Sequence, residues 1–377
     1  MFKKFAAALA CSFLWSAPLL AEETTGTANT TIAASTAQDS ADVSSEEEHF
    51  QRWSALPVIG YSEETELQYG AMGILFFKPS EKGGKVSEID VTAYGSTRGQ
   101  FQFFFCPYFY LYHDQISGWL DLRYQNWVAS YFGMGNDPDY DVSTTFDRQM
   151  FYFGAELEST IGVPREFKYG AELHIEYADI EFHKGGELEL PDAHSGWRNG
   201  LGYLIAYDTR DNTNWTRHGF LAQWQQMFFS DHLGDYSFDV EKLDIRGFTE
   251  LFRDASMAVG FLWQRSGGDA PFDLLAGPDG IKRFRGVESL YFRDEQALIL
   301  QAELRKFLGW RLAGTIFFEG GKVGDHFSEL LRNKWHYGLG FGGQLALNLK
   351  EQLYARGEFS WIDFDHLGIT VYIRHAF

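Results

Sequence analysis

The sequence predicts an all-β fold, a transmembrane antiparallel β-barrel of about sixteen strands. Three observations favour this class. Aromatic residues make up 17% of the 377 residues, and 39 residues are glycine while only 9 are proline. Segment after segment alternates apolar with polar residues, which is the period of a strand. After the N-terminal region there is no run of about 20 apolar residues, so no transmembrane helix is expected. A soluble β-protein is the competing class.

The first residues of the chain are predicted to lie outside the barrel. Residues 1–21 have the pattern of a secretory signal peptide, with two lysines, an apolar run and Ala21 before two glutamates. Residues 22–52 are rich in Ser, Thr and acidic residues and predict a disordered leader. This leader is too short for a folded domain without cross-links. We therefore expect one folded domain, the barrel over residues 53–377.

The predicted strands follow one another along the whole barrel region. In Phe167–Tyr177, aromatic and aliphatic residues alternate with charged residues and glycine. One face of such a strand suits lipid and the other suits a water-filled interior, whereas a small soluble barrel has an apolar interior. The alternation is weakest in 237–250, where three charged residues share a face with Phe238 and Phe248. The predicted strands are 54–61, 66–77, 86–97, 99–110, 116–128, 147–160, 166–178, 197–208, 218–228, 237–250, 254–264, 294–306, 310–320, 333–347, 351–361 and 367–377.

A long interruption, Ser266–Tyr291, separates the eleventh and twelfth predicted strands. It is rich in Gly, Asp and Pro. Long loops of such barrels lie on the outer side of the membrane, where this loop would be the sixth. The segments Gln296–Phe307 and Arg311–Gly321 then alternate clearly, with Glu303 and Glu319 on their polar faces. At the spacing of paired strands, about 5 Å, two such carboxylates would repel each other.

Arg285 and Gly286 in this loop could relieve that repulsion. An arginine presents a planar fork of donors that binds two carboxylates at once. Glycine lets the backbone approach the barrel wall closely. We therefore predict that Arg285 sits between Glu303 and Glu319 and anchors the loop inside the barrel. A plain surface arginine is the alternative.

A second motif, Tyr207 to Asn212, lies at a strand-to-turn boundary. It contains Asp208, Arg210 and Asp211. Aspartate in such a place commonly caps the turn by accepting hydrogen bonds from backbone N–H groups. We favour this capping role over a role in binding a substrate.

Together these motifs resemble the bacterial surface antigen family of outer-membrane barrels, the assembly and translocation superfamily that includes BamA and TamA. The family usually has aspartate at the position of Glu319 and an aromatic residue at that of Val287. The resemblance covers Trp53–Phe377. The motifs that carry it are Phe284-Arg285-Gly286-Val287, Phe292-Arg293-Asp294, Gln301-Ala302-Glu303-Leu304-Arg305, Phe317-Phe318-Glu319-Gly320-Gly321 and the turn at Asp208.

The resemblance implies a barrel whose sixth loop folds into the lumen. A weak seam between Trp53–Tyr61 and the last strand is a further expectation. The resemblance also implies an assembly signal at the C-terminus, where Phe377 follows alternating apolar residues. The loop anchor would consist of Arg285, Gly286, Glu303 and Glu319, with Asp294, Arg305, Phe317 and Gly321 as supporting residues.

Charge and cysteine content narrow the range of functions. The net charge of −20 argues against nucleic-acid binding and against adhesion to an anionic inner leaflet. Of the two cysteines, Cys11 lies in the predicted signal peptide. Cys106 alone can form neither an intramolecular disulfide nor a cysteine-based zinc site. No cofactor and no metal are expected.

For function, the resemblance implies insertion or translocation of protein or lipid at the bacterial outer membrane, which the chain would reach by export through the inner membrane. BamA-like members carry periplasmic polypeptide-transport-associated domains, which this chain is expected to lack. That expectation leaves room for a separate periplasmic partner protein. The other expected partners are outer-membrane lipid and lipopolysaccharide, and the barrel is expected to be a monomer. The alternative is a transport pore or a structural barrel without assembly activity.

Enzyme chemistry is the rival class, because some outer-membrane barrels hydrolyse lipid with a serine and a histidine on the wall. The sequence has no Gly-x-Ser-x-Gly nucleophile motif. We therefore expect no enzymatic activity. The histidines that an outer-membrane lipid hydrolase could use are His113, His174, His183, His326 and His336.

Overall fold

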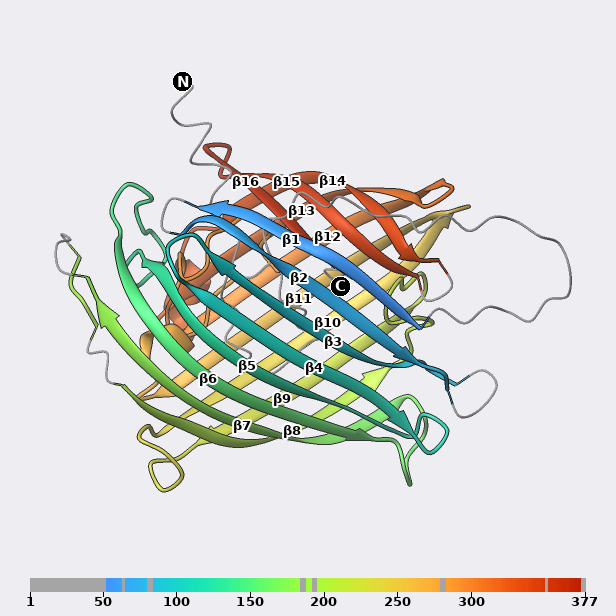
Figure 1. Cartoon of the computed structure of the whole chain (residues 1–377), viewed down its shortest axis with the longest axis horizontal. Coiled ribbons are helices and arrows are strands. Elements are labelled where there is room, and N and C mark those ends of the chain that lie inside the picture. The colour runs from blue at the N-terminus through green and yellow to red at the C-terminus, as the bar shows by residue number, and fades with distance from the viewer. Residues whose placement is uncertain are drawn as a thin grey trace, which may run out of the picture.

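The computed structural model describes residues 52–62, 65–79, 84–183, 188–191, 195–278, 283–349 and 352–373. These residues form one antiparallel sheet of sixteen strands arranged in chain order. The sheet curls round on itself into the shape of a barrel (Figure 1). The predicted all-β fold and the strand number are therefore confirmed. No helix within the described ranges is long and apolar enough to cross a membrane.

The strands lie where the alternation predicts them. β7 continues to Phe182 rather than to residue 178, and β11 continues to Gly268 rather than to residue 264. Two short helices were not predicted, the 3-10 turn η1 at Phe272–Leu274 and the helix α2 at Phe327–Arg332. The strand bounds are β1 Trp53–Ser62, β2 Glu66–Phe77, β3 Ser87–Ser96, β4 Phe101–Leu111, β5 Ile116–Tyr131, β6 Thr144–Ser159, β7 Phe167–Phe182, β8 Gly196–Asp208, β9 Gly219–Phe229, β10 Phe238–Phe252, β11 Ala255–Gly268, β12 Gln296–Gly309, β13 Leu312–Gly324, β14 His336–Asn348, β15 Leu353–Ile362 and β16 His366–Ile373.

The two faces of the sheet differ as the period of two requires, and β12 shows this most clearly. Leu300 and Leu304 point outward and are exposed, whereas Glu303 and Arg305 point inward and are buried. The outward face also carries aromatic rows. Tyr124, Phe151, Tyr177 and Trp197 are exposed and are each the direct partner of the next across β5–β8. The outward face therefore suits lipid.

The inner face is not polar throughout, which corrects an expectation from the sequence. Across β1–β5 it carries a buried apolar cluster that also includes Leu353 at the start of β15. These strands therefore pack against apolar partners inside the barrel instead of lining a water-filled space. The buried members are Leu56, Val58, Met72, Ile74, Phe76, Tyr94, Phe104, Cys106, Tyr108, Trp119, Trp127 and Leu353.

β10 forms in spite of its weak alternation. Asp244 and Arg246 are buried on the same face as Phe248. The two charges are paired there, because Arg246 Nη2 donates to Asp244 Oδ2 at 2.8 Å. Paired charges and an aromatic ring can share a buried face, and this mixture obscured the pattern in the sequence.

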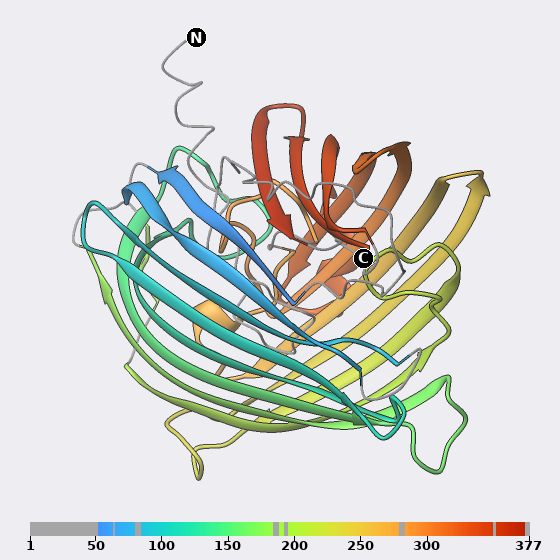
Figure 2. The same cartoon turned by 45° about the vertical axis from the view of Figure 1, so that its right-hand side comes forward.

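The two ends of the sheet are not joined by strand pairing among the described residues. β1 pairs with β2, β16 pairs with β15, and the sheet order runs from β1 to β16 without closing. Figure 2 shows the first strands in blue and the last strands in red as separate edges of the curled sheet. Leu56 and Val58 of β1 belong to the same apolar cluster as Leu353 of β15.

The connection between β11 and β12 packs against the inner face of the sheet. Its described parts, residues 269–278 and 283–295, are called the inner segment below. The two parts meet where the Asp294 N–H donates to the C=O of Ala276 at 3.1 Å. Phe284 is fully buried, so the segment is packed like a core element.

Candidate functional site

Arg285 lies at the centre of a buried ion-pair cluster on the inner face. Its backbone N–H and its Nε each donate to the Glu319 carboxylate at 2.7 Å. Its Nη1 donates to Glu303 Oε2 at 2.5 Å. The guanidinium carbon lies 3.5 Å from the centre of the Phe317 ring, a cation–π contact. The structure thus brings together the arginine and both glutamates named from the sequence.

Glu303 and Glu319 are nevertheless not direct cross-strand partners, which corrects the spacing assumed from the sequence. Glu303 pairs with Phe317, and Glu319 pairs with Gln301. The carboxylates are therefore one diagonal step apart, and Arg285 spans that step. Alternation assigns a residue to a face, but it does not fix the register between strands.

β15 supplies a third carboxylate and a second arginine that the sequence reasoning missed. Arg285 Nη1 lies 3.2 Å from Glu358 Oε2. Arg356 Nη2 donates to Glu358 at 2.6 Å and to Glu303 at 2.9 Å. Arg305 Nε also donates to Glu303, at 2.5 Å. The sequence did contain a signal for these two residues. An arginine and a glutamate lie two residues apart on the polar face of β15, as they do in β12.

Glycine is required at two places around this cluster. Gly286 has a φ of +87°, and a Cβ there would lie 2.8 Å from Ser360 Oγ and 3.0 Å from Gly368 Cα. A side chain at this position would be strained and would collide with β15 and β16. At Gly321 a Cβ would lie 2.8 Å from the Phe284 ring. Gly321 therefore supports the loop by leaving room for Phe284.

Asp294 lies away from Arg285, at the junction of the two parts of the inner segment. It is half-buried, and its backbone N–H donates to Ala276. Burial, together with the nearby charges of Asp325, Glu329 and Glu295, raises the pKa of Asp294 to about 6. The supporting residue named from the sequence thus belongs to a group of acidic residues where β12 begins and β13 ends, and it does not touch the arginine cluster.

A second buried cluster, absent from the sequence predictions, holds η1. Asp273 Oδ2 accepts from Arg198 Nη1 of β8 at 2.7 Å and lies 3.3 Å from Arg148 Nη2 of β6. Glu176 of β7 lies between the same two arginines, at 2.8 Å and 3.0 Å. All four side chains are at most 1% exposed. Nothing local in the sequence links these positions, because Arg198 and Asp273 are 75 residues apart.

The turn motif makes contacts of the capping kind. Asp208 Oδ1 accepts from the Arg210 N–H at 3.1 Å and from its Nε at 2.9 Å. Asp211 Oδ1 accepts from the N–H groups of Arg217 and His218 at 2.9 Å and 3.2 Å. These hydrogen bonds order the β8–β9 connection.

The same connection reaches the opposite wall of the barrel. Trp215 is 3% exposed and packs with Ala313, Ala346 and Tyr354, which belong to β13, β14 and β15. The ring centres of Trp215 and Tyr354 are 4.8 Å apart. The inner segment and the β8–β9 turn thus both reach across the interior of the barrel.

The remaining predictions about targeting lie outside the described residues. These are the signal peptide at residues 1–21, the assembly signal at Phe377, and the leader except for Arg52. They stay predictions.

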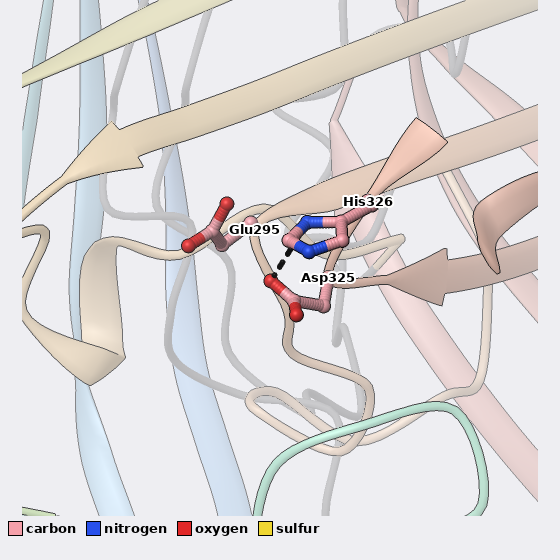
Figure 3. Close-up of side chains that lie close together, drawn as sticks. All are labelled: Glu295, Asp325 and His326. Atoms are coloured by element: carbon pink, nitrogen blue, oxygen red, sulfur yellow. Dashed lines mark ion pairs between the residues drawn. The ribbon is translucent and has the colours of Figure 1, made fainter. Parts of the chain in front are cut away.

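One group of side chains, where β12 begins and β13 ends, has the composition of a metal site. Glu295, Asp325 and His326 place one ligand atom each within 4.8 Å of one another (Figure 3). Asp325 and His326 are mostly exposed, and His326 Nδ1 lies 3.3 Å from the Asp325 carboxylate. Exposed His–Asp contacts of this kind are ordinary surface ion pairs. We assign no metal-binding role to the group.

His183 is the histidine whose surroundings come nearest to a hydrolase triad. Its ring nitrogens lie 2.8 Å from Thr145 Oγ1 and 2.8 Å from Asp147 Oδ2. About half of the His183 and Asp147 side chains is exposed to solvent, at 47% and 53%. Nucleophilic catalysis depends on water exclusion and on donors aimed at the developing oxyanion. We therefore treat this group as a surface contact. His174 is buried instead, 3.2 Å from Glu176.

No protein-family model and no curated protein sequence matches the chain. Solved structures do match. BamA from Haemophilus ducreyi lacking POTRA domains 1–3 aligns with a TM-score of 0.54 at 11% identity, over 85% of this chain and 69% of that chain. CdiB from Acinetobacter baumannii aligns with a TM-score of 0.55 at 9% identity, over 82% of this chain and 56% of that chain. At these identities the likeness concerns the fold. The chain thus has the barrel fold of BamA and CdiB, which is the fold its loop motifs predicted.

Proposed function

We propose that this chain is an outer-membrane barrel that inserts or translocates protein or lipid at the edge between β1 and β16. The observation that carries the proposal is the strand order of the described residues, which runs from β1 to β16 without a ladder between these two strands. A sheet edge without a neighbouring strand can pair with the backbone of an incoming strand. An edge of this kind suits a barrel that hands other chains or lipids to the membrane.

The filled interior supports insertion or translocation at the barrel wall rather than passage of a solute through the lumen. The inner segment occupies the interior at Phe284 and Arg285, both fully buried. The β8–β9 connection crosses the barrel at Trp215. A transport pore, the alternative function, would need these elements to move aside.

The residues of the outward face support lipid as a partner. The exposed aromatic row across β5–β8 suits the boundary between hydrocarbon and headgroups, where such rings concentrate. We propose that outer-membrane lipid, including lipopolysaccharide, surrounds the barrel, and that a separate periplasmic protein delivers the cargo. A monomer suffices for this arrangement.

A reversible chemical cross-link between β1 and β16, called the edge lock below, tests the proposal. In a Cys106→Ala background, Ala55→Cys on β1 and Val371→Cys on β16 are joined with a reducible bifunctional maleimide. The matched control joins Ala71→Cys and Ala93→Cys, which are direct partners on β2 and β3. The readout is the folding of an added outer-membrane protein into liposomes that contain the barrel, before and after reduction.

We expect the edge lock to abolish insertion, reduction to restore it, and the control link to leave it unchanged. Equal insertion by the locked and unlocked barrels would sink the proposal. High ionic conductance of the locked barrel in planar bilayers, together with no insertion in any form, would favour the pore instead.

A further inference from the structure

The inner segment is fixed to the wall formed by β5–β10 through η1. Each residue of Phe272–Leu274 contacts a different group of residues on that wall. Phe272 packs against Phe146 of β6 in one apolar cluster, and Leu274 packs against Val240 of β10 in another. Between them, Asp273 reaches the arginines of the second ion-pair cluster.

The same segment is fixed to the opposite wall, next to the edge between β1 and β16. Arg285 binds carboxylates of β12, β13 and β15. Gly286 rests against Gly368 of β16. At the start of β16, the His366 ring lies 3.6 Å from the Tyr140 ring, which stacks on Tyr291 at 3.6 Å. The last strand is thus held from inside the barrel by the inner segment and its neighbour Tyr140.

Described contacts connect the two attachments. Besides the bridge between Ala276 and Asp294, Arg293 Nη1 donates to the C=O of Leu275 at 2.9 Å. These residues join the part that carries Asp273 to the part that carries Arg285. Force on one wall can therefore pass to the other wall through ordered backbone.

We propose that the inner segment is a cross-brace, and that the contact of Asp273 with Arg198 and Arg148 limits how far β1 and β16 separate at the end nearest this segment. The strand order of the described residues has no ladder between these two strands. The apolar cluster at Leu353 lies at the other end of β15, so it leaves the His366 end of the edge to the brace. The inference deepens the proposed function, because it concerns the opening of the same edge.

Two variants isolate the contact. Asp273→Asn removes the carboxylate and leaves Arg148 and Arg198 facing Glu176 alone, so it also unbalances buried charge. The double variant Asp273→Asn with Arg198→Gln removes one charge of each sign and leaves Arg148 paired with Glu176. The control is Asp231→Asn, because Asp231 is 67% exposed in the turn after β9.

The measurement is the distance between spin labels at Tyr69→Cys on β2 and Trp361→Cys on β15, in the full chain with Cys106→Ala. Both positions are exposed on the outward face near the end of the edge that His366 begins. A second label pair, Leu157→Cys on β6 and Tyr203→Cys on β8, reports whether the braced wall keeps its fold. Both sites are exposed.

We expect the first distance to lengthen by about 5 Å, the width of one strand, and to broaden in both anchor variants. The second distance and the Asp231→Asn control stay unchanged. An unchanged first distance in the double variant would overturn the brace. A lengthened second distance would overturn it as well, because the walls would then deform independently of the edge. The labels report on the edge without any cargo, so failure of the insertase proposal would leave this result standing.

Discussion

At the scale of single residues, Arg285 is the centre of one buried ion-pair cluster in the interior. It is fully buried and contacts three carboxylates, while Arg305 and Arg356 neutralise the remaining charge. Removing one member of such a group leaves buried charge without compensation. The balance of the cluster thus depends on a side chain from a loop and not on the strands alone.

Arg285→Ala should therefore lower the free energy of unfolding of the barrel by about 3–5 kcal/mol. The change is measured by urea titration in detergent. The folded fraction is read on gels of unheated samples, as the band of the folded barrel that heating shifts. Arg253→Ala is the matched control, because Arg253 is 96% exposed, and it should shift the free energy by no more than about 0.5 kcal/mol. Arg285→Lys should fall between the two, since lysine keeps the charge but loses the planar fork. Equal effects of the two alanine variants would contradict the anchoring role.

Substitution of Gly286 distinguishes the cost of backbone strain from the cost of a close contact with β15 and β16. Gly286→Ala should destabilise the barrel by more than the about 1–2 kcal/mol that a left-handed backbone alone costs a residue with a Cβ, because the new methyl would also meet Ser360 and Gly368. Gly99→Ala is the matched control, with a φ of +92° and nothing within 4 Å of the added Cβ. The same unfolding assay compares the two variants. If the two variants lose the same free energy of unfolding, the contact of Gly286 with β16 contributes nothing to stability.

At the scale of elements, the junction of the inner segment should respond to pH. The pKa of Asp294 is raised to about 6, so the folded state favours the protonated carboxyl. That stabilisation is present below the unfolded pKa of about 4 and is lost as the pH rises through about 6. Hydrogen exchange at the Asp294 amide, corrected for intrinsic rates, should slow between pH 7 and pH 5. Asp294→Asn should remove the change, and persistence of it there would assign the effect to another group.

The strand elements were predictable because their physics is local. A period of two in β12 and β13 places Glu303 and Glu319 on the inner face without reference to any other strand. The partners across the barrel were not predictable in this way. Whether Arg285 meets Glu358, or Asp273 meets Arg198, depends on the register and curl of the whole sheet. The apolar inner face of β1–β5 was missed for the same reason, since packing inside the curl decides it.

At the scale of the whole molecule, the crossed interior predicts a barrel that conducts ions poorly. Replacing the inner segment by a short Gly-Ser linker should raise the single-channel conductance in planar bilayers several-fold. Shortening the β6–β7 turn at residues 160–166, which lies outside the interior contacts described above, should leave the conductance at its original value. A high conductance of the unaltered chain would show that the inner segment does not obstruct the lumen.

The anchoring contacts join residues far apart in the sequence, so they can form only late in folding. Arg285 and Glu358 are 73 residues apart, and Arg198 and Asp273 are 75 apart, so both contacts need most of the sheet in place. Contacts made after the rate-limiting step slow unfolding and leave folding speed unchanged. Substitutions at Arg285 or Asp273 should thus accelerate unfolding in detergent while the folding rate stays constant. The lifetime of the assembled barrel would then depend on the contacts of its loop as well as on its strand ladders.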